Sequence, residues 1–370
     1  MRSKPQEDAL SSYGSVTLDK ERLLELLGKI IAKRSLAQLR QQTCALKQSL
    51  VSAGNNPDGL FSSSSNGNTI SLRRDILVAE LDQILEARTI ERARYYLKRL
   101  ERGVKEDRTT EINDINLMRW KEYEEIITDS LWDFSKRDTT GAHLGWYWGN
   151  FIPQIPRQLM LRYTKKGDLV LDAFAGSGTT LIECRRQGRN GLGIELNPQV
   201  ARKAAALIAK ESNPHSVTTE IITGDARTVD ARPALAALTS KQAQLLIMHP
   251  PYHDIISFSE DEKDLSRAAS TAEFLKLFDE VVGNLAPLLE RGRYLALVIG
   301  DKYSKGEWIP LGFQCMNRVL ERGFLLKSVV VKNFEETRAK RDQKQLWRYR
   351  ALAGGFYIFK HEYIFVFKKR

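Results

Sequence analysis

Cysteine is scarce in this chain of 370 residues, which holds only Cys44, Cys184 and Cys315. An odd and widely separated set predicts neither a disulfide framework nor a zinc site, and it fits a reducing cytoplasm. Long apolar runs are missing as well, so we expect no membrane span. The first residues, MRSKPQEDALSS, lack the apolar stretch of a secretory signal, which again favours the cytoplasm.

Several binding and catalytic signatures are also missing. The P-loop pattern GxxxxGK[ST] is absent, and the dinucleotide pattern GxGxxG fails because Leu181 occupies its third glycine position. No cysteine follows a proline, which disfavours the covalent mechanism of cytosine-C5 methylation. His249 and His253 are four residues apart, but two prolines between them oppose a helix, and we predict no metal site.

The charge balance is positive. The 57 Lys and Arg residues outnumber the 46 Asp and Glu residues, which gives a net charge of +11 at pH 7. A basic chain is attracted to polyanions because binding releases their condensed counterions. Charge alone fits a nucleic-acid partner and an ordinary solvated surface equally well.

Residues 1–115 form a predicted N-terminal helical region. Apolar residues at positions i, i+4, i+7 and i+8 predict two amphipathic helices, within residues 23–31 and 77–85. Asp19 is the expected N-cap of the first helix. Residues 52–69 are rich in Ser, Gly and Asn, which predicts a flexible linker. No internal repeat is evident.

Residues 116–370 alternate between strand-like and helix-like segments. This alternation predicts a mostly parallel sheet covered on both faces by helices. The last two strands are separated by a basic, glycine-broken segment, so we expect an antiparallel edge strand. The predicted fold is therefore α/β and Rossmann-like, with a seven-stranded sheet. Its strands are expected at residues 169–171, 191–194, 220–222, 245–248, 294–299, 324–331 and 363–367.

A glycine-containing turn follows the first of these strands in LVLDAFAGSGTT, residues 169–180. Gly176 and Gly178 permit a tight turn and leave room for a ligand. Thr179 and Thr180 open a helix whose free N–H groups face that ligand. In an open α/β sheet this edge, at the carboxyl ends of the strands, is where ligands bind.

Three carboxylates end three successive strands: Asp172, Glu195 and Asp225. Glu195 is placed to accept hydrogen bonds from ribose hydroxyls, and Asp225 to accept one from an adenine amino group. Single acids at strand ends are often only solvated caps. Nothing basic faces the loop, so the pattern fits a neutral or cationic adenosyl ligand better than a pyrophosphate.

The sequence HPPY, from His249 to Tyr252, follows the apolar strand at residues 245–248. A base amine is a poor nucleophile because its lone pair is delocalised into the ring. A side-chain acceptor and the carbonyl of Pro250 can take its two hydrogens, and the prolines make the strand-end loop rigid. The following aromatic can stack on the base. The alternative is that the prolines only end the strand and that Tyr252 belongs to the core.

These segments resemble the DNA amino-methyltransferases, the adenine-N6 and cytosine-N4 enzymes of the class I S-adenosylmethionine-dependent fold. LDAFAGSGTT resembles their cofactor motif, with Phe174 in the aromatic position. HPPY matches three positions of their catalytic (D/N/S)PP(Y/F) motif. Residues 150–168 resemble the segment before the cofactor motif, and residues 361–369 resemble the final strand. The resemblance covers about residues 140–370, within a methyltransferase domain expected at 116–370.

The resemblance implies the cofactor, the partner and the roles of the site residues. The partner is double-stranded DNA with the target base flipped out, in a restriction–modification system of the cytoplasm, associated with the nucleoid. The residues expected to bind S-adenosylmethionine are Asp172, Phe174, Gly176, Gly178, Thr179, Glu195 and Asp225, and the catalytic residues are His249, Pro250, Pro251 and Tyr252.

His249 departs from the family, which has Asp, Asn or Ser at this position. Neutral imidazole accepts one hydrogen bond but imidazolium accepts none, which predicts a loss of rate at acidic pH. The family likeness favours cytosine N4 as the target, with adenine N6 as the alternative. Two further alternatives are an RNA methyltransferase acting on a guanine amine of transfer RNA and a non-enzymatic DNA-binding module.

Residues 332–350, KNFEETRAKRDQKQLWRYR, hold seven basic and three acidic side chains with Trp347 and Tyr349 between them. Arginines can bind phosphates or guanine edges, and aromatics can stack on unpaired bases. A solvated basic loop is the competing interpretation. The expected nucleic-acid-binding residues are Arg338, Lys340, Arg341, Lys344, Arg348 and Arg350.

Overall fold

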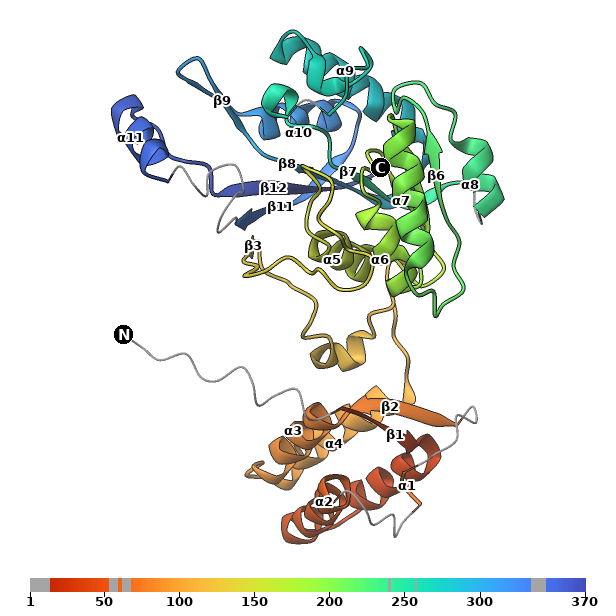
Figure 1. Ribbon diagram of the computed structural model, residues 1–370. Helices are drawn as coiled ribbons and strands as arrows, with labels where there is room; N and C mark the ends of the chain where they lie inside the picture. Colours follow the sequence, from red (N-terminus) through yellow and green to blue (C-terminus); the bar gives the residue numbers. More distant parts are fainter. Residues whose placement is uncertain (1–13, 53–58, 62–67, 239–240, 257, 334–343) are drawn as a thin grey trace. The chain divides into compact units, whose positions relative to one another are not determined.

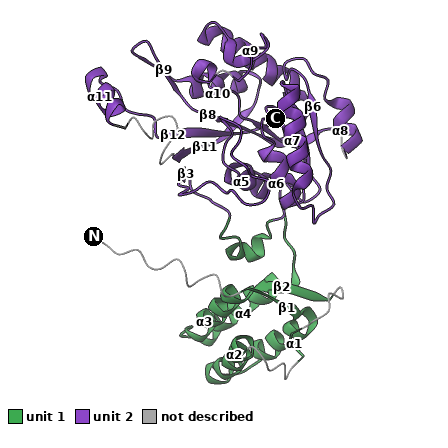
Figure 2. Cartoon of the chain, in the orientation of Figure 1, with its two compact units in different colours: residues 1–110, 115–125 green, residues 111–114, 126–370 purple. Residues whose placement is uncertain are grey.

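The computed structural model describes residues 14–52, 59–61, 68–238, 241–256, 258–333 and 344–370 (Figure 1). The chain divides into two compact units (Figure 2). Unit 1 comprises residues 1–110 and 115–125, and unit 2 comprises residues 111–114 and 126–370. No helix in the described part of the chain is long and apolar enough to cross a bilayer.

Unit 1 consists of helices packed around a two-stranded antiparallel sheet. The predicted segments 23–31 and 77–85 fall within two of these helices, and the Asp19 carboxylate caps the first by accepting from the Arg22 N–H at 2.8 Å. Leu23 and Leu77 belong to one apolar core that all four α-helices share. The elements are β1 (Ser15–Asp19), α1 (Lys20–Ile31), α2 (Leu36–Val51), β2 (Thr69–Arg73), α3 (Arg74–Leu85), α4 (Ile90–Lys105) and the 3-10 helix η1 (Leu117–Glu122).

Unit 1 contains an internal repeat, which corrects the expectation that the chain has none. The order strand, helix, helix occurs twice, and each element of the second copy begins 54 residues after its counterpart. Lys20 and Arg74 begin the first helix of each copy, and Ser35 and Thr89 cap the second helix. β1 and β2 pair with each other, so the two copies meet along a shared ribbon.

The predicted linker at residues 52–69 is partly anchored. Its segments 53–58 and 62–67 lie outside the described residues. Leu60 is buried and its carbonyl accepts from the Asp19 N–H, while Phe61 forms a bridge with Leu18. Thr69 already belongs to β2. The Ser-rich composition therefore conceals one apolar anchor point in the connection between the two repeats.

Unit 2 is built on an eight-stranded sheet in the order β3-β11-β12-β8-β7-β4-β5-β6. The neighbours β8, β7, β4, β5 and β6 are parallel, so their carboxyl ends meet at one edge. The predicted class I methyltransferase fold is confirmed. Its strands are β3 (Leu131–Trp132), β4 (Leu169–Asp172), β5 (Asn190–Glu195), β6 (Thr219–Thr223), β7 (Ala243–Met248), β8 (Leu289–Ile299), β11 (Leu325–Asn333) and β12 (His361–Lys368).

Two details of the sheet differ from the expectation. The two-residue strand β3 adds an eighth strand by pairing in parallel with β11. The antiparallel strand β12 lies between β11 and β8 and not at the edge. Six successive residues of β12, Glu362–Phe367, are buried, as in a strand with neighbours on both sides, whereas β11 is mostly half-buried or exposed.

Helices cover both faces of this sheet. Leu246 and Met248 of β7 pack with the helices α8 to α10, and Leu245 and Ile247 pack with α5 on the opposite face. Strands β9 and β10 form a separate hairpin. The elements outside the large sheet are α5 (Gln154–Tyr163), α6 (Thr179–Gln187), α7 (Pro198–Lys210), α8 (Arg232–Leu238), α9 (Thr271–Leu285), β9 (Lys302–Ser304), β10 (Glu307–Ile309), α10 (Leu311–Glu321) and α11 (Lys344–Gly354).

Candidate active site

The turn after β4 has the glycine geometry that the sequence predicts. Gly176 and Gly178 have φ angles of 49° and 79°, in the left-handed region that favours glycine. A Cβ atom on Gly178 would lie 2.6 Å from Cδ1 of Ile208, and one on Gly176 would lie 3.0 Å from Cε1 of Tyr147. Gly178 is the N-cap of α6, so the free N–H groups of this helix begin at the turn.

Glu195, at the end of β5, supports this turn. Its Oε2 accepts from the Gly176 N–H at 2.9 Å, and its Oε1 accepts from the Asn197 N–H at 2.8 Å. Burial raises the pKa of the Glu195 carboxyl. Each carboxylate oxygen has a second lone pair, so Glu195 keeps the capacity to accept from a ligand hydroxyl.

Asp172 and Asp225 are less available than the sequence suggests. Asp172 is buried and accepts from the Phe174 N–H at 2.9 Å, and burial raises its pKa to about 6. Asp225 forms a forked ion pair with Arg227, whose NH2 and Nε atoms lie 2.7 and 3.0 Å from its Oδ2. A ligand amino group would share the Asp225 carboxylate with this guanidinium.

The HPPY segment follows β7, which lies beside β4 in the sheet. The Tyr252 hydroxyl donates to Oε2 of Glu362 at 2.7 Å, and Nε2 of His249 lies 3.2 Å from the same hydroxyl oxygen. Phe151 contacts the His249 ring edge-on, with ring centroids 4.8 Å apart. Burial lowers the pKa of His249 to about 4, so its imidazole is neutral near pH 7.

The two motifs face one cavity of about 1160 Å³. His249, Pro250, Pro251 and Tyr252 all line it. Asp172 and Gly178 are not among its lining residues and instead shape the turn. The predicted cofactor residues that do line it are Phe174, Gly176, Thr179, Glu195 and Asp225.

Several lining residues were not predicted. Lys332 and Glu362 are paired across β11 and β12, and both are buried, with Nζ and Oε1 3.1 Å apart. Tyr147 stacks on Phe258, and Trp148, which is 57% exposed, also lines the cavity. The signal for the ion pair is a charged residue beside the apolar run of each strand, Lys332 after residues 329–331 and Glu362 before residues 363–367.

Only part of the predicted nucleic-acid segment can be placed. Arg338, Lys340 and Arg341 lie outside the described residues, whereas Lys344, Arg348 and Arg350 belong to α11. Arg348 and Arg350 are exposed, and the Arg350 guanidinium lies 5.2 Å from the centroid of the Trp347 ring. Tyr349 is 69% exposed, so basic and aromatic groups alternate on an accessible helix.

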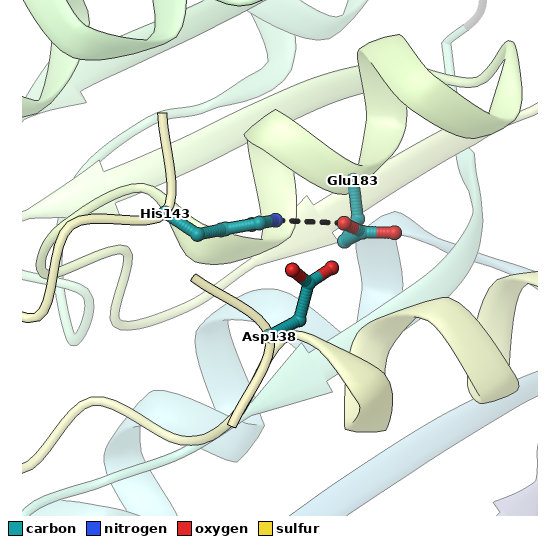
Figure 3. Close-up of side chains that lie close together, drawn as sticks. All are labelled: Asp138, His143 and Glu183. Atoms are coloured by element: carbon teal, nitrogen blue, oxygen red, sulfur yellow. Dashed lines mark hydrogen bonds and ion pairs between the residues drawn. The ribbon is translucent and has the colours of Figure 1, made fainter. Parts of the chain in front are cut away.

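A second cluster in unit 2 joins Asp138, His143 and Glu183, whose potential ligand atoms lie within 4.8 Å of one another (Figure 3). His143 Nε2 lies 2.7 Å from Oε1 of Glu183. The Arg186 guanidinium lies 3.2 Å from Asp138 and 3.5 Å from Glu183. Arg186 therefore supplies the positive charge that these carboxylates need, and the cluster is an ion-pair network.

Part of this chain matches a known family of proteins. Residues 80–206, which include the glycine turn, α6 and β5, match the family described as DNA methylase. The resemblance to DNA amino-methyltransferases is confirmed. The S-adenosylmethionine dependence expected from the sequence fits this match.

The similar methylases match over short segments. The type II methyltransferase M.MjaII of Methanocaldococcus jannaschii is 38% identical over 86 residues, covering 21% of this chain and 16% of that protein. M.Cfr9I of Citrobacter freundii is 39% identical over 70 residues, covering 19% and 22%. The chain thus matches less than a quarter of the length of either relative.

Solved structures share only distant similarity with this chain. TrmN from Thermus thermophilus is 17% identical, with a TM-score of 0.37 over 60% of this chain and 50% of that one. YjhP from E. coli is 14% identical, with a TM-score of 0.38 over 62% and 98%.

Proposed function

We propose that this protein is a DNA methyltransferase that moves a methyl group from S-adenosylmethionine to an exocyclic base amine. The observation that carries this proposal is the placement of two motifs on neighbouring parallel strands. The glycine turn follows β4, HPPY follows β7, and both line the same cavity. A methyl donor and a base amine held there would lie within one enclosure.

The residues at the glycine turn fit an adenosyl cofactor. Gly176 and Gly178 keep the turn free of side chains, and Glu195 presents a carboxylate with free acceptor capacity for ribose. The cavity exceeds the roughly 300–1,000 Å³ usual for one small ligand, so a base has room beside the cofactor. When bound, S-adenosylmethionine would supply the electrophilic methyl group.

The HPPY residues prepare the nucleophile. His249 and the Pro250 carbonyl are proposed to accept the two amine hydrogens, which draws the nitrogen lone pair out of conjugation. Tyr252 is proposed to stack on the base. Gly300 leaves space for that ring, because a Cβ atom there would lie 2.9 Å from Cε2 of Tyr252. Transfer of the methyl group leaves an extra proton on the amine, which must then be lost.

Cytosine N4 is the proposed target, and adenine N6 is the alternative. In the DNA amino-methyltransferases an Asp at the first motif position favours adenine and a Ser favours cytosine N4. Burial keeps the His249 imidazole uncharged near pH 7, so it is electrostatically closer to Ser than to Asp. The RNA and non-enzymatic alternatives have no observation in their favour.

The proposed partner is double-stranded DNA with the target base flipped into the cavity. Arg348 and Arg350 of α11 are proposed to contact phosphates. A role in a restriction–modification system is proposed from the type II methyltransferase relatives. A location in the cytoplasm, at the nucleoid, would follow from the proposed DNA substrate.

Incubation of unmethylated DNA with tritiated S-adenosylmethionine tests the proposal. After digestion to nucleosides, mass spectrometry should find N4-methylcytosine in DNA treated with the native protein and at least about tenfold less with Tyr252→Ala. N6-methyladenine would assign the other base. Label in transfer RNA but not in DNA, or no binding of S-adenosylmethionine by calorimetry, would contradict it.

A further inference from the structure

A buried chain of hydrogen bonds connects an ion pair to the proposed acceptor His249. Lys332 Nζ lies 3.1 Å from Oε1 of Glu362, and Oε2 of Glu362 accepts from the Tyr252 hydroxyl at 2.7 Å. The Tyr252 oxygen lies 3.2 Å from Nε2 of His249. Lys332 and Glu362 are 5% and 4% exposed. A buried ion pair is seldom retained for stability alone, because desolvation offsets most of its attraction.

The direction of this chain follows from counting protons. An ionised Glu362 can only accept, and the Lys332 ammonium lies 3.1 Å from its Oε1. The single proton of the Tyr252 hydroxyl therefore points to Glu362. The contact between Tyr252 and His249 is then a hydrogen bond only if Nε2 carries a proton.

The other ring nitrogen of His249 is consequently the acceptor. Neutral imidazole carries one proton, so a protonated Nε2 leaves a lone pair on Nδ1. Within the described part of the chain, Nδ1 has no hydrogen-bond partner, and the atom is not fully enclosed by the protein. Because His249 lines the cavity, Nδ1 is the nitrogen left to meet a ligand.

We propose that Lys332 and Glu362 are positioning residues that hold His249 in its Nε2–H tautomer, so that Nδ1 accepts a hydrogen of the base amine. This inference rests on the proposed function. It assigns a task to two residues of β11 and β12 that the catalytic motif does not contain. Phe151, edge-on to the imidazole, limits rotation of the ring.

The double substitution Lys332→Met with Glu362→Leu tests this assignment without leaving an unpaired buried charge. The Tyr252 hydroxyl then loses its acceptor and donates to Nε2, which moves the histidine proton to Nδ1. We expect the rate of methyl transfer to fall about a hundredfold, within the usual range for loss of a proton-handling group. The dissociation constant for S-adenosylmethionine should not change.

The matched control is Lys332→Met with Glu362→Gln. It removes the same charges but keeps a carbonyl oxygen that can accept from Tyr252. We expect this variant to keep the native tautomer and a rate within about tenfold of native. The two double variants differ only at residue 362, so a general effect of removing the ion pair would appear in both.

Nitrogen-15 NMR of histidine-labelled protein reads the tautomer directly. The His249 signals are assigned by their absence from His249→Asn, and the native protein should show protonated Nε2 and bare Nδ1 near neutral pH. Protonated Nδ1 in the native protein, or an unchanged tautomer in the double variant that carries Glu362→Leu, would overturn the assignment. The spectrum needs no DNA, so a native spectrum of the expected form without DNA methylation would refute only the proposed function.

A second observation concerns the internal repeat of unit 1. The outer face of α4 exposes Arg92, Tyr95, Lys98, Arg102 and Lys105 at helical spacing. One acid, Glu91 in the first turn, is exposed on the same face, which stays basic on balance. The residues 54 positions earlier, on α2, are Gln38, Gln41, Cys44, Gln48 and Val51, and they carry no charge. The second helix of the repeat therefore has a basic outer face in one copy, α4, and a neutral outer face in the other copy, α2.

We infer that the outer face of α4 is a contact surface for the phosphates of duplex DNA. Its four cations are spaced along one helix, and Arg92 also lies over the Tyr95 ring, 5.3 Å from its centroid. Phosphate binding by such a face releases counterions and makes affinity depend steeply on salt. The neutral face of α2 provides an internal control on the same scaffold.

Two triple variants with the same change in charge separate this surface from a general charge effect. The first is Arg92→Gln, Lys98→Gln and Arg102→Gln, and the second is Gln38→Glu, Gln41→Glu and Gln48→Glu. Anisotropy with a labelled duplex should show the α4 variant binding more than about tenfold weaker, with a salt slope lower by roughly 2–3. The α2 variant should stay within about twofold. Equal losses in both, or none in the α4 variant, would overturn the inference, and folding is checked by thermal melts.

Discussion

Oε2 of Glu195 accepts a hydrogen bond from the Gly176 N–H at 2.9 Å, which connects the end of β5 to the glycine turn after β4. The same carboxylate caps the Asn197 N–H at 2.8 Å. These contacts fix the turn before any ligand binds, which reduces the ordering that binding must impose.

Glu195→Ala should weaken binding of S-adenosylmethionine by about ten- to a hundredfold, since hydrogen bonds to charged groups contribute roughly 1.5–3 kcal/mol. Titration calorimetry measures the effect. Asp230→Asn removes an exposed acid of unit 2 and serves as the control. Equal affinity in the native protein and Glu195→Ala would remove this carboxylate from the site.

The rate of methyl transfer should stay level from neutral pH down to about pH 5 and fall at lower pH, because the lowered pKa of His249 is about 4. Above this value the imidazole is neutral and accepts, and below it the imidazolium cannot. His249→Asn should lack this acid limb, because an amide does not titrate. Single-turnover rates across pH test this, and a limb centred near 6.5 would mean that burial does not control His249.

The same group makes unfolding sensitive to acid. The pKa of His249 is lowered from 6.5 to about 4 in the folded protein, so between these values the unfolded chain binds a proton that the folded chain does not. Stability should fall by up to roughly 3 kcal/mol as pH drops through this window. Urea unfolding of native protein and His249→Asn should show a smaller loss in the variant.

Tyr252→Ala should lower methyl transfer by at least about tenfold to a hundredfold, since stacking on a base contributes roughly 1–3 kcal/mol. Affinity for S-adenosylmethionine should be nearly unchanged. Tyr357→Ala, at a tyrosine that is 87% exposed, is the matched control. If Tyr252→Ala loses cofactor binding and transfer together, the ring supports the fold and does not hold the base.

Arg348→Glu with Arg350→Glu should weaken DNA binding and lower the dependence of log affinity on log salt by about 2, one for each lost phosphate contact. Lys210→Glu with Arg232→Glu makes the same change of charge at two exposed positions on α7 and α8. Anisotropy titrations at several salt concentrations compare them. The same slope of log affinity against log salt in both variants would show that α11 has no role in binding.

The strands of unit 2 could be predicted because each carries a short apolar run, and HPPY and the glycine turn could be predicted because each is a local pattern. The position of β12 could not, since it depends on pairing with β8 and β11. Its continuous apolar sequence is the signal of an interior strand.

The residues proposed to act with the catalytic motif could not be predicted from local sequence patterns. Glu362 is 110 residues from Tyr252 in sequence, and only the pairing of β11 with β12 brings Lys332 beside it. The repeat of unit 1 was hidden for another reason. Its copies share apolar spacing and capping positions, but the side chains on their outer faces differ. The two sequences therefore look unlike, and the repeat is evident only from the matching bounds of the helices.

The central place of β12 also affects how the protein is made. While residues 361–368 are still inside the ribosome, β8 and β11 have no strand between them. A nascent chain therefore exposes unpaired backbone on two strands, which invites pairing with other chains. A delay in the emergence of residues 361–368 should consequently raise the aggregated fraction.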